Sequence, residues 1–586
     1  MHASHFCLAQ EEISFEGGLH RPDSRAAEMD VIHSEAQRAF LKKMGRTESQ
    51  DWKLDANYSL RVLDPELVRV VPLRLLLRKR SILDSSVGSE TTFRMSKPAA
   101  VIDFFISHAW ATPGWLKRIC LAFEMNAAHA AVAAILTHAL VHVFDIAGVL
   151  RFPIPTTNDD SVVWAGGKAI PSRWTLHCVV GMAVFWIVLG WRMDFCCTGS
   201  TCFLDKCCIH QTDPRKKDVG VKQLGACLRW SEHLMIFWQP EFFTRLWCVY
   251  ELAAFLHING GDCSKVSILP LKLPTFVVAC CAGYSLAAIV FNTVGAPYII
   301  LHRLHTEWVI ENVQPAGLQP VYAVFYVGIT VVVSLYSITA PLFWMFGRWH
   351  MRDRRELLKQ VHNFRFADAE CTEASDRVFV DRQITEWFGD ITTFEQYVRT
   401  DVAFQVEHLI DEVGPIPFRM ALISAVFHVM FAMSLALNHL QDGDAQMCLR
   451  ACIGLGGMAL NGVPIGLNLV LRLADTPLGD IAEGKSFFRR HVLGPALASL
   501  ILASCTAAPI ASYVPACPLW MAAVLFVTEV GCTCLLYNVR PGAPFQRRAS
   551  DPPGTGVPAA SSIIGCQDAD AQGTSQAVAV APTFSL

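Results

Sequence analysis

Four polar residues follow short apolar runs that are typical of buried strands. Ser107 and His108 close the first of these runs, Asp205 follows the second and Gln239 follows the third. Uninterrupted apolar runs of this kind are typical of strands that are covered on both faces of a parallel sheet. Such sheets bind ligands at the carboxyl ends of their strands, where loops and helix N-termini converge. We therefore expect Ser107, His108, Asp205 and Gln239 to line one ligand-binding edge.

Strand and helix patterns alternate around these residues. We expect strands at 101–110, 202–206, 234–238 and 266–270, and helices at 219–229 and 245–257. This alternation predicts a doubly wound parallel sheet.

The composition of the whole chain indicates a membrane protein. Of its 586 residues, 52% are hydrophobic and only 17% are charged. Because Lys and Arg number 49 against 52 Asp and Glu, no basic surplus is available to coat a nucleic acid, and we expect no nucleic-acid partner. The 21 cysteines are scattered through a large chain, which favours reduced thiols over a disulfide framework. Charged residues recur through the first hundred positions, so we expect no cleaved signal peptide.

Uncharged runs long enough for a bilayer core predict an α-helical polytopic membrane protein with the lipid bilayer as a partner. About eight transmembrane helices are expected by this rule, at 126–144, 174–191, 275–295, 320–346, 420–440, 451–471, 492–513 and 518–539. Lys and Arg are concentrated in the loops after the even-numbered segments, which places those loops and both termini in the cytosol. The plasma membrane is the default location.

These observations divide the chain into seven parts. They are an N-terminal cytosolic region (1–95), an α/β module in two pieces (96–125 and 192–272), a transmembrane hairpin (126–191) that splits the module, a second transmembrane hairpin (275–346), a cytosolic helical region (347–419), a four-helix transmembrane region (420–539) and a tail (540–586). The tail is rich in Gly, Pro, Ala and Ser, and we expect it to be disordered.

The α/β module resembles the Toll/interleukin-1 receptor (TIR) domains. The run Asp103 to Ser107 is similar to the opening strand of that family. Phe243 with Arg245 to Leu252 resembles the helix of plant TIR domains that carries a Ser/Arg-Trp-Cys-Leu-x-Glu-Leu motif. The resemblance covers about 101–118 and 202–270 and extends to TIR-like multi-pass proteins of protists and algae. It implies a flavodoxin-like parallel sheet and a signalling function through self-association of TIR modules or through another cytosolic protein.

The resemblance also implies a role for Glu251. This residue occupies the position of the glutamate with which catalytic TIR domains cleave the nicotinamide–ribose bond of NAD. A carboxylate there could bind ribose hydroxyls and stabilise an oxocarbenium-like transition state, which makes NAD a candidate substrate and the chain a candidate NAD glycohydrolase. The alternative is that Glu251 pairs with Arg245 or caps a turn. In the NAD-cleavage hypothesis NAD is the substrate, and no cofactor is expected with certainty.

Cys202, Cys207, Cys208 and His210 have the side chains that zinc prefers. Their spacing lacks a CxxC pair, and free cysteines are commonly small buried apolar residues. We therefore expect no metal site.

Polar residues within the apolar segments support a competing function. His138, His142 and Asp145 are spaced to share one face of the first segment, and Glu529 lies in the last. Ionisable residues inside a membrane suggest a proton relay or an ion path, although they also hydrogen-bond helices together. The alternative function is therefore a transporter or channel with a regulatory TIR-like domain, marked by a continuous polar pathway.

Overall fold

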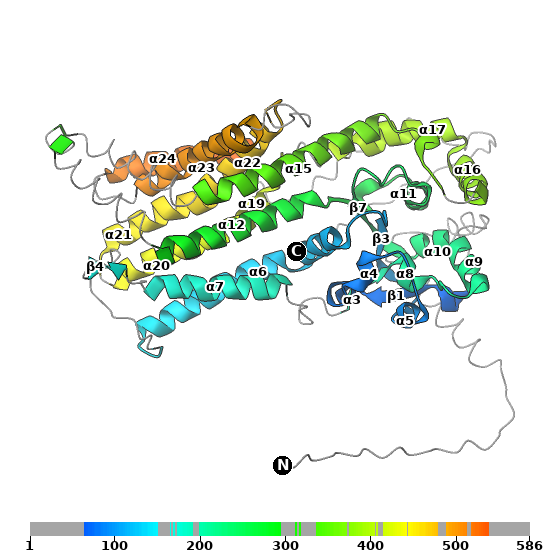
Figure 1. Ribbon diagram of the computed structural model, residues 1–586, viewed down its shortest axis with the longest axis horizontal. Helices are drawn as coiled ribbons and strands as arrows, with labels where there is room; N and C mark the ends of the chain where they lie inside the picture. Colours follow the sequence, from blue (N-terminus) through cyan, green and yellow to red (C-terminus); the bar gives the residue numbers. More distant parts are fainter. Residues whose placement is uncertain are drawn as a thin grey trace, which may run out of the picture. The chain divides into compact units, whose positions relative to one another are not determined.

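The structure is a computed structural model that describes residues 64–150, 164–165, 168–169, 173–190, 199–294, 311–312, 316–317, 336–371, 374–404, 406–407, 414–441, 443–478, 488–512 and 517–537. Most of the predicted N-terminal region and the predicted tail lie outside these residues. The described part is mostly helical and contains one six-stranded sheet (Figure 1).

The centre of the sheet is parallel, as the apolar runs predict. Strands β6 (Thr201–Phe203), β3 (Ile102–His108), β7 (Ser231–Trp238) and β8 (Val266–Pro270) lie side by side in that order. In chain order the strands are therefore second, first, third and fourth, so the order reverses at β3. The register pairs Ser107 with Ile236 and His108 with Phe237, which places the carboxyl ends of β3 and β7 at one edge.

Two further strands extend the sheet in the antiparallel sense. β1 (Arg69–Pro72) pairs with β6, and β2 (Lys97–Pro98) pairs with β1. Short helical segments lie between these strands and before them: η2 (Pro65–Leu67), α3 (Leu73–Arg78), α4 (Ser81–Asp84) and α5 (Glu90–Phe93). The last part of the predicted N-terminal region thus contributes β1 to the same sheet as the expected strands.

Helices connect the parallel strands. α11 (Leu246–Ile258) confirms the helix expected after the third strand, whereas the helix expected at 219–229 is divided into α9 (Pro214–Lys222) and α10 (Leu224–Arg229). Asp205 to Cys208 form the single-turn helix α8, and η3 (Cys263–Lys265) leads into β8. We call β1–β3, β6–β8 and the helices between them, apart from α6 and α7, the α/β module.

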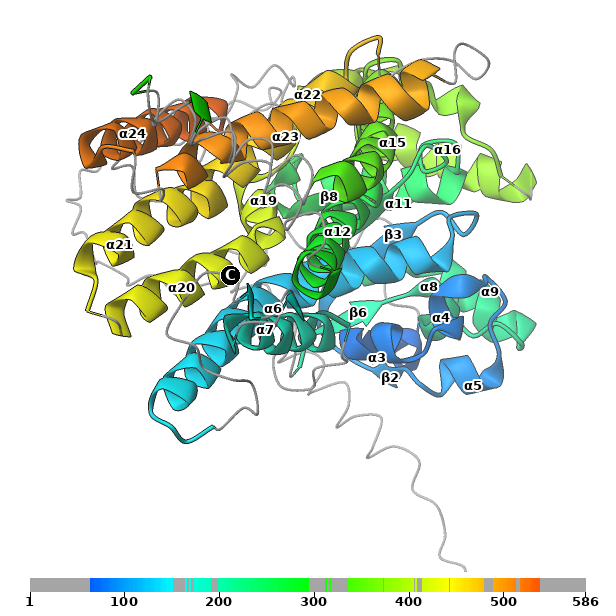
Figure 2. The same ribbon diagram turned by 60° about the vertical axis from the view of Figure 1, so that its left-hand side comes forward.

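The first helix of the module and the first long apolar helix are one element. α6 runs without interruption from Gly114 to Ile146 and packs along α7 (Arg173–Gly190), as both views show (Figures 1 and 2). The short strands β4 (Trp164–Ala165) and β5 (Lys168–Ala169) lie between α6 and α7 in the chain. The predicted hairpin is therefore joined to the sheet by a continuous helix rather than by a loop.

The segment that follows the second hairpin covers α11. α15 (Ser337–His362) leads into η6 (Phe366–Asp368), α16 (Ala374–Phe388), α17 (Ile391–Tyr397) and η7 (Val398–Val402). Val380, Ile384 and Phe394 of this segment belong to the same buried apolar cluster as the sheet. The indole of Trp247 on α11 donates to Asp376 at 2.9 Å.

The remaining helices are α12 (Lys272–Val294), α19 (Phe418–Ser424), α20 (Val426–Gln441), α21 (Ala445–Arg450), η8 (Ala451–Leu455), η9 (Met458–Gly462), α22 (Val463–Ala474), η10 (Arg489–Leu493), α23 (Gly494–Ala511) and α24 (Leu519–Leu536). Most of them, but not α21 and η10, contribute described residues to a second buried apolar cluster. α6, α7 and part of α15 contribute to the same cluster.

The expectation of eight crossing helices is corrected to three or four. Among the described residues, Gly114–Ile146, Ala445–Ala474 and Leu519–Leu536 are long and apolar enough to cross a bilayer, and Phe418–Ser424 with Val426–Gln441 make a fourth if this pair, bent by 57°, is one span. The described apolar parts of the helices at 174–191, 275–295 and 492–513 are shorter than the length that a bilayer requires. Most of 320–346 lies outside the described residues.

Candidate functional site

One side-chain hydrogen bond joins the end of β3 to helix α11. The Ser107 hydroxyl donates to Oε2 of Glu251 at 2.5 Å. Ser107 is buried, and Glu251, in the second turn of α11, is partly exposed. Because β3 and α11 belong to the first and third strand–helix units, the contact lies where the strand order reverses. That reversal is where doubly wound sheets open their ligand crevice.

Glu251 is surrounded on its own helix by apolar residues. Nearly every other residue of this helix is buried and apolar, including Leu252 and Phe255 beside it. The turn that leads into the helix is held by the Phe242 N–H, which donates to the Gln239 carbonyl at 2.8 Å. α11 thus carries one carboxylate, and this carboxylate meets the end of β3.

Asp205 lies at the neighbouring strand end with a separate set of partners. Its Oδ2 accepts from the indole N–H of Trp110 at 2.8 Å, and its Oδ1 accepts from the Lys206 N–H at 2.6 Å. The ammonium groups of Lys117 and Lys206 stand over the Trp110 ring at 4.9 and 5.8 Å from its centroid. Trp110 therefore links the acid to two cations.

Lys206 is itself anchored to the antiparallel side of the module. Its ammonium donates to the carbonyls of Ser81 at 2.8 Å and Ser85 at 2.7 Å, at the two ends of α4. This contact holds the segment after β6, including Asp205, against the part of the chain that precedes β3.

Burial keeps the carboxyl groups of the site protonated at a higher pH than usual. Desolvation raises the pKa of Glu251 to about 8; the Ser107 hydrogen bond opposes this rise and the Asp205 charge adds to it. Desolvation also raises the pKa of Asp205, against the hydrogen bonds from Trp110 and Lys206. The pKa of Cys248, one turn before Glu251, is held well above its usual range by burial and by the Glu251 charge. Burial thus favours the protonated form of Glu251 at pH 7.

The two other predicted edge residues lie beside this group. His108 is buried with its ring edge-on to Trp110 at 4.4 Å, and within the described residues its ring nitrogens have no hydrogen-bond partner. Burial first, and the Lys117 charge second, hold the pKa of His108 well below its usual range, so this imidazole is neutral. Gln239 is buried at the end of β7, where its carbonyl shapes the turn into α11.

The alternative roles considered for Glu251 are not the ones that the structure displays. Arg245 is exposed and immediately precedes α11 as its N-cap residue. It forms a parallel bridge with Glu370, whose carbonyl accepts from the Leu246 N–H at 2.9 Å. Glu251 instead accepts from Ser107, 144 residues away in the chain.

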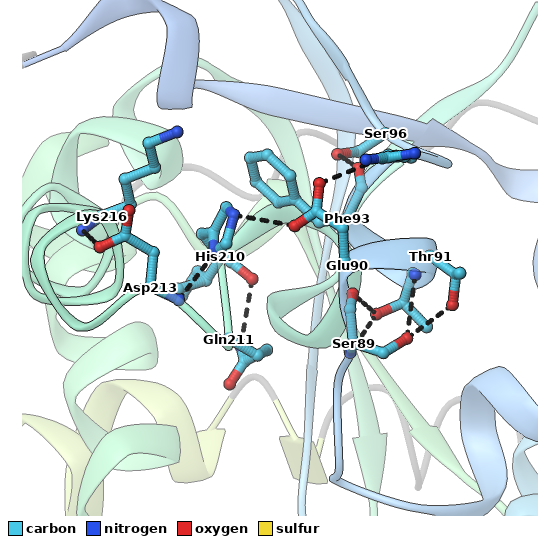
Figure 3. Close-up of polar contacts among 12 residues, drawn as sticks. Ser89, Glu90, Thr91, Phe93, Ser96, His210, Gln211, Asp213 and Lys216 are labelled. Atoms are coloured by element: carbon cyan, nitrogen blue, oxygen red, sulfur yellow. Dashed lines mark hydrogen bonds and ion pairs between the residues drawn. The ribbon is translucent and has the colours of Figure 1, made fainter.

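The group of cysteines with His210 is built into the core. Cys202, Cys207 and Cys208 are buried free thiols, and burial raises the pKa of each. Figure 3 shows His210 between Glu90 and Asp213: its Nε2 lies 3.1 Å from Glu90 Oε2, and its Nδ1 accepts from the Asp213 N–H at 3.0 Å. No group of three or more His, Cys, Asp or Glu suited to a metal ion occurs among the described residues.

Sequence reasoning missed the residues that support the carboxylates. Trp110 and Lys117 follow β3 closely, but an aromatic residue and a lysine at the start of an apolar helix carry no specific motif. Asp376 and Glu370, which contact the α11 region, lie more than a hundred residues away across another pair of helices. Only the folded chain brings these groups together.

Comparisons with protein-family models, with curated proteins and with solved structures found no match to this chain.

Proposed function

We propose that the chain is a membrane-anchored signalling protein whose TIR-like, flavodoxin-like α/β module cleaves NAD at Glu251. The single observation that carries this proposal is the Ser107–Glu251 contact at the reversal of the strand order. Self-association of the modules, with both termini in the cytosol, belongs to the same proposal because TIR-type modules act on one another.

The proposed reaction needs one carboxylate. The bond between the ribose carbon and the nicotinamide nitrogen breaks, and nicotinamide leaves with the bonding electron pair. Water adds to the ribosyl cation and releases a proton, which yields ADP-ribose. Ionised Glu251 would stabilise the cation and hold the ribose hydroxyls, while the Ser107 hydroxyl orients the carboxylate.

The electrostatics of the site fit a cationic substrate. Glu251 is largely protonated at neutral pH because its pKa is raised to about 8. The positive charge of the nicotinamide ring favours the ionised carboxylate when it lies close by, so substrate binding would itself generate the active form.

The test is nicotinamide release from NAD by the full-length protein in detergent, at several concentrations and after crosslinking. Glu251→Gln and Glu251→Ala should lose activity while retaining the melting behaviour of a folded protein. Glu241→Gln, an exposed glutamate in the turn before α11, is the matched control and should remain active. Absence of nicotinamide release from the native chain under every condition would leave assembly as the module's function.

A second candidate, a transporter or channel with a regulatory TIR-like domain, is favoured by one observation. A buried imidazole of α6 contacts a hydroxyl of α20, since the His138 Nε2 lies 3.0 Å from the Ser434 Oγ. Glu529 on α24 lies elsewhere, beside Gly457. Flux through reconstituted liposomes that requires both His138 and Glu529 would support this candidate.

A further inference from the structure

Three polar residues between α6 and α7 form a buried chain of contacts. His142 Nδ1 lies 2.9 Å from His177 Nδ1, and His177 Nε2 lies 3.3 Å from Asp145 Oδ2. The two histidines are 1% exposed and Asp145 is 8% exposed. Sequence spacing placed His142 and Asp145 on one face of α6, and the fold adds His177 from α7. We call this group the His142–His177–Asp145 chain.

The geometry selects one arrangement of protons. The Nδ1–Nδ1 contact can hold a single hydrogen, so one ring donates and the other accepts. If His177 Nδ1 carried that hydrogen, a bare Nε2 lone pair would face the Asp145 carboxylate. The favourable neutral arrangement therefore has His177 Nε2–H facing Asp145 and His142 Nδ1–H donating to His177.

This arrangement leaves one basic atom. His142 Nε2 then carries a lone pair, and within the described residues it is buried without a hydrogen-bond partner. A proton added there would convert His142 to imidazolium. Its charge would be balanced by Asp145 through the intervening His177 ring.

Two other titratable groups among the described residues lie near the His142–His177–Asp145 chain, an imidazole and a thiol that contact one hydroxyl of α20. On α6, the His138 ring lies 6.3 Å from the His142 ring, and its Nε2 contacts Ser434 of α20. On α7, the Cys178 thiol lies 3.9 Å from the same hydroxyl. Among the described residues, Asp145 is the carboxylate that faces the imidazoles of His142 and His177.

The chain lies at the end of α6 that is remote from the sheet. Asp145 follows Gly114 by 31 residues of continuous helix, which at the rise of an α-helix is about 45 Å. The remote polar group and the edge of the sheet are therefore two ends of one rigid element.

We propose that the His142–His177–Asp145 chain is a proton-binding site, with the proton taken up at His142 Nε2 and its charge balanced by the Asp145 carboxylate. The proton comes from solvent, and no other bond forms or breaks. A metal ion suits this geometry poorly, because the two Nδ1 atoms face each other across one hydrogen bond rather than converging on a common point.

The test is nitrogen NMR of the full-length protein in lipid nanodiscs, with ring-labelled histidine. The signals of His142 are identified by their loss in His142→Gln. On lowering the pH from about 8 to about 5, the range of histidine switches, the two ring signals should converge as imidazolium forms. In Asp145→Asn, the ratio of protonated to neutral His142 at a given pH should fall about tenfold, the effect of losing one nearby countercharge.

His138→Gln is the matched control, because it removes a neighbouring imidazole outside the chain, and the His142 titration should persist in it. The proposal is overturned if His142 stays neutral across the range in folded protein, or if it titrates identically in Asp145→Asn. It is also overturned if the ring signals respond to added Zn²⁺ at constant pH, because the site would then be a metal site.

Discussion

The edge of the sheet and the α6–α7 hairpin each hold a carboxylate against a polar group from another element, but the partners differ in kind. Glu251 accepts from the hydroxyl of Ser107, which cannot carry a positive charge. Asp145 faces the imidazole of His177, and beyond it that of His142, which can. Burial therefore favours the protonated form of Glu251, whereas the imidazoles of the hairpin can take up a proton that balances the charge of Asp145.

The difference shows that the partner, rather than burial alone, decides what a carboxylate does. Glu251 is partly exposed at the reversal of the strand order, where a ligand can reach it. Asp145 is buried, so that its environment admits a proton more readily than a larger ligand. α6 begins beside the first site and ends at the second, so the two sites can be perturbed separately on one helix.

The largest effects are expected when the carboxylate of each site is replaced by an amide, and each replacement should affect its own site alone. Glu251→Gln is expected to reduce nicotinamide release by about a hundredfold or more, because it removes a preorganised charge at the reacting centre. The same variant should leave the His142 titration unchanged. Asp145→Asn should instead lower the protonation of His142 and leave nicotinamide release unchanged. If Asp145→Asn reduced nicotinamide release as strongly, the two sites would not be independent.

The stability of the module should depend on pH through Glu251. Its pKa is raised in the folded chain to about 8 from the ordinary 4.5, so the folded state binds more protons than the unfolded state between these values. The stability contributed by this group is fully present below 4.5 and is lost as the pH rises through about 8, by up to about 1.4 kcal/mol per pH unit.

The measurement is the melting temperature of the native chain and of Glu251→Gln across this range. The variant should gain stability relative to the native chain as the pH rises. A difference between them that stays constant with pH would mean that Glu251 is ionised in the folded state already.

Lys206→Met should weaken the module and spare the hairpin. Removing the ammonium leaves the Ser81 and Ser85 carbonyls without their donor, at an expected cost of about 2 kcal/mol in the free energy of unfolding. Hydrogen exchange should accelerate in β6 and α4 and remain unchanged in α7. Equal acceleration in α7 would show that the two regions unfold as one unit.

Ser107→Ala should shift the pH dependence of nicotinamide release. The hydroxyl hydrogen bond stabilises the ionised form of Glu251, so its removal raises the pKa of that carboxyl further. We expect the rising limb of the pH–rate profile to move about one unit higher, the scale on which one hydrogen bond to a charged group acts. A lower rate with an unmoved profile would make Ser107 a packing residue.

The smallest effect should come from a surface ion pair that neither site uses. Asp218→Asn removes the contact with Lys222 on α9, where both side chains are about half exposed. The expected change in the free energy of unfolding is below about 0.5 kcal/mol, because solvent screens such pairs. A larger loss would indicate that α9 supports the sheet through its charge.

The parts of the fold that could be predicted are those coded by local patterns. The apolar runs before Ser107, Gln239 and Pro270 locate β3, β7 and β8, and the helix that carries Glu251 is confirmed almost to its ends. The antiparallel strands β1 and β2 were not predicted, because β1 lies in a mixed run of apolar and basic residues and β2 has only two residues, so neither shows a strand period. The number of crossing helices was overestimated, because uncharged composition was counted where continuous helix length decides.

The sequence by itself determined that this chain has long apolar helices, a parallel sheet and polar residues at its carboxyl edge, since each of these depends on neighbours within a few positions. It also placed His142 and Asp145 on one face of α6. Only the tertiary structure decided that Glu251 meets Ser107 and that His177 completes the remote chain. Those contacts depend on how strands and helices far apart in the chain are ordered and packed, and a single sequence carries no local pattern that specifies a partner at such distances.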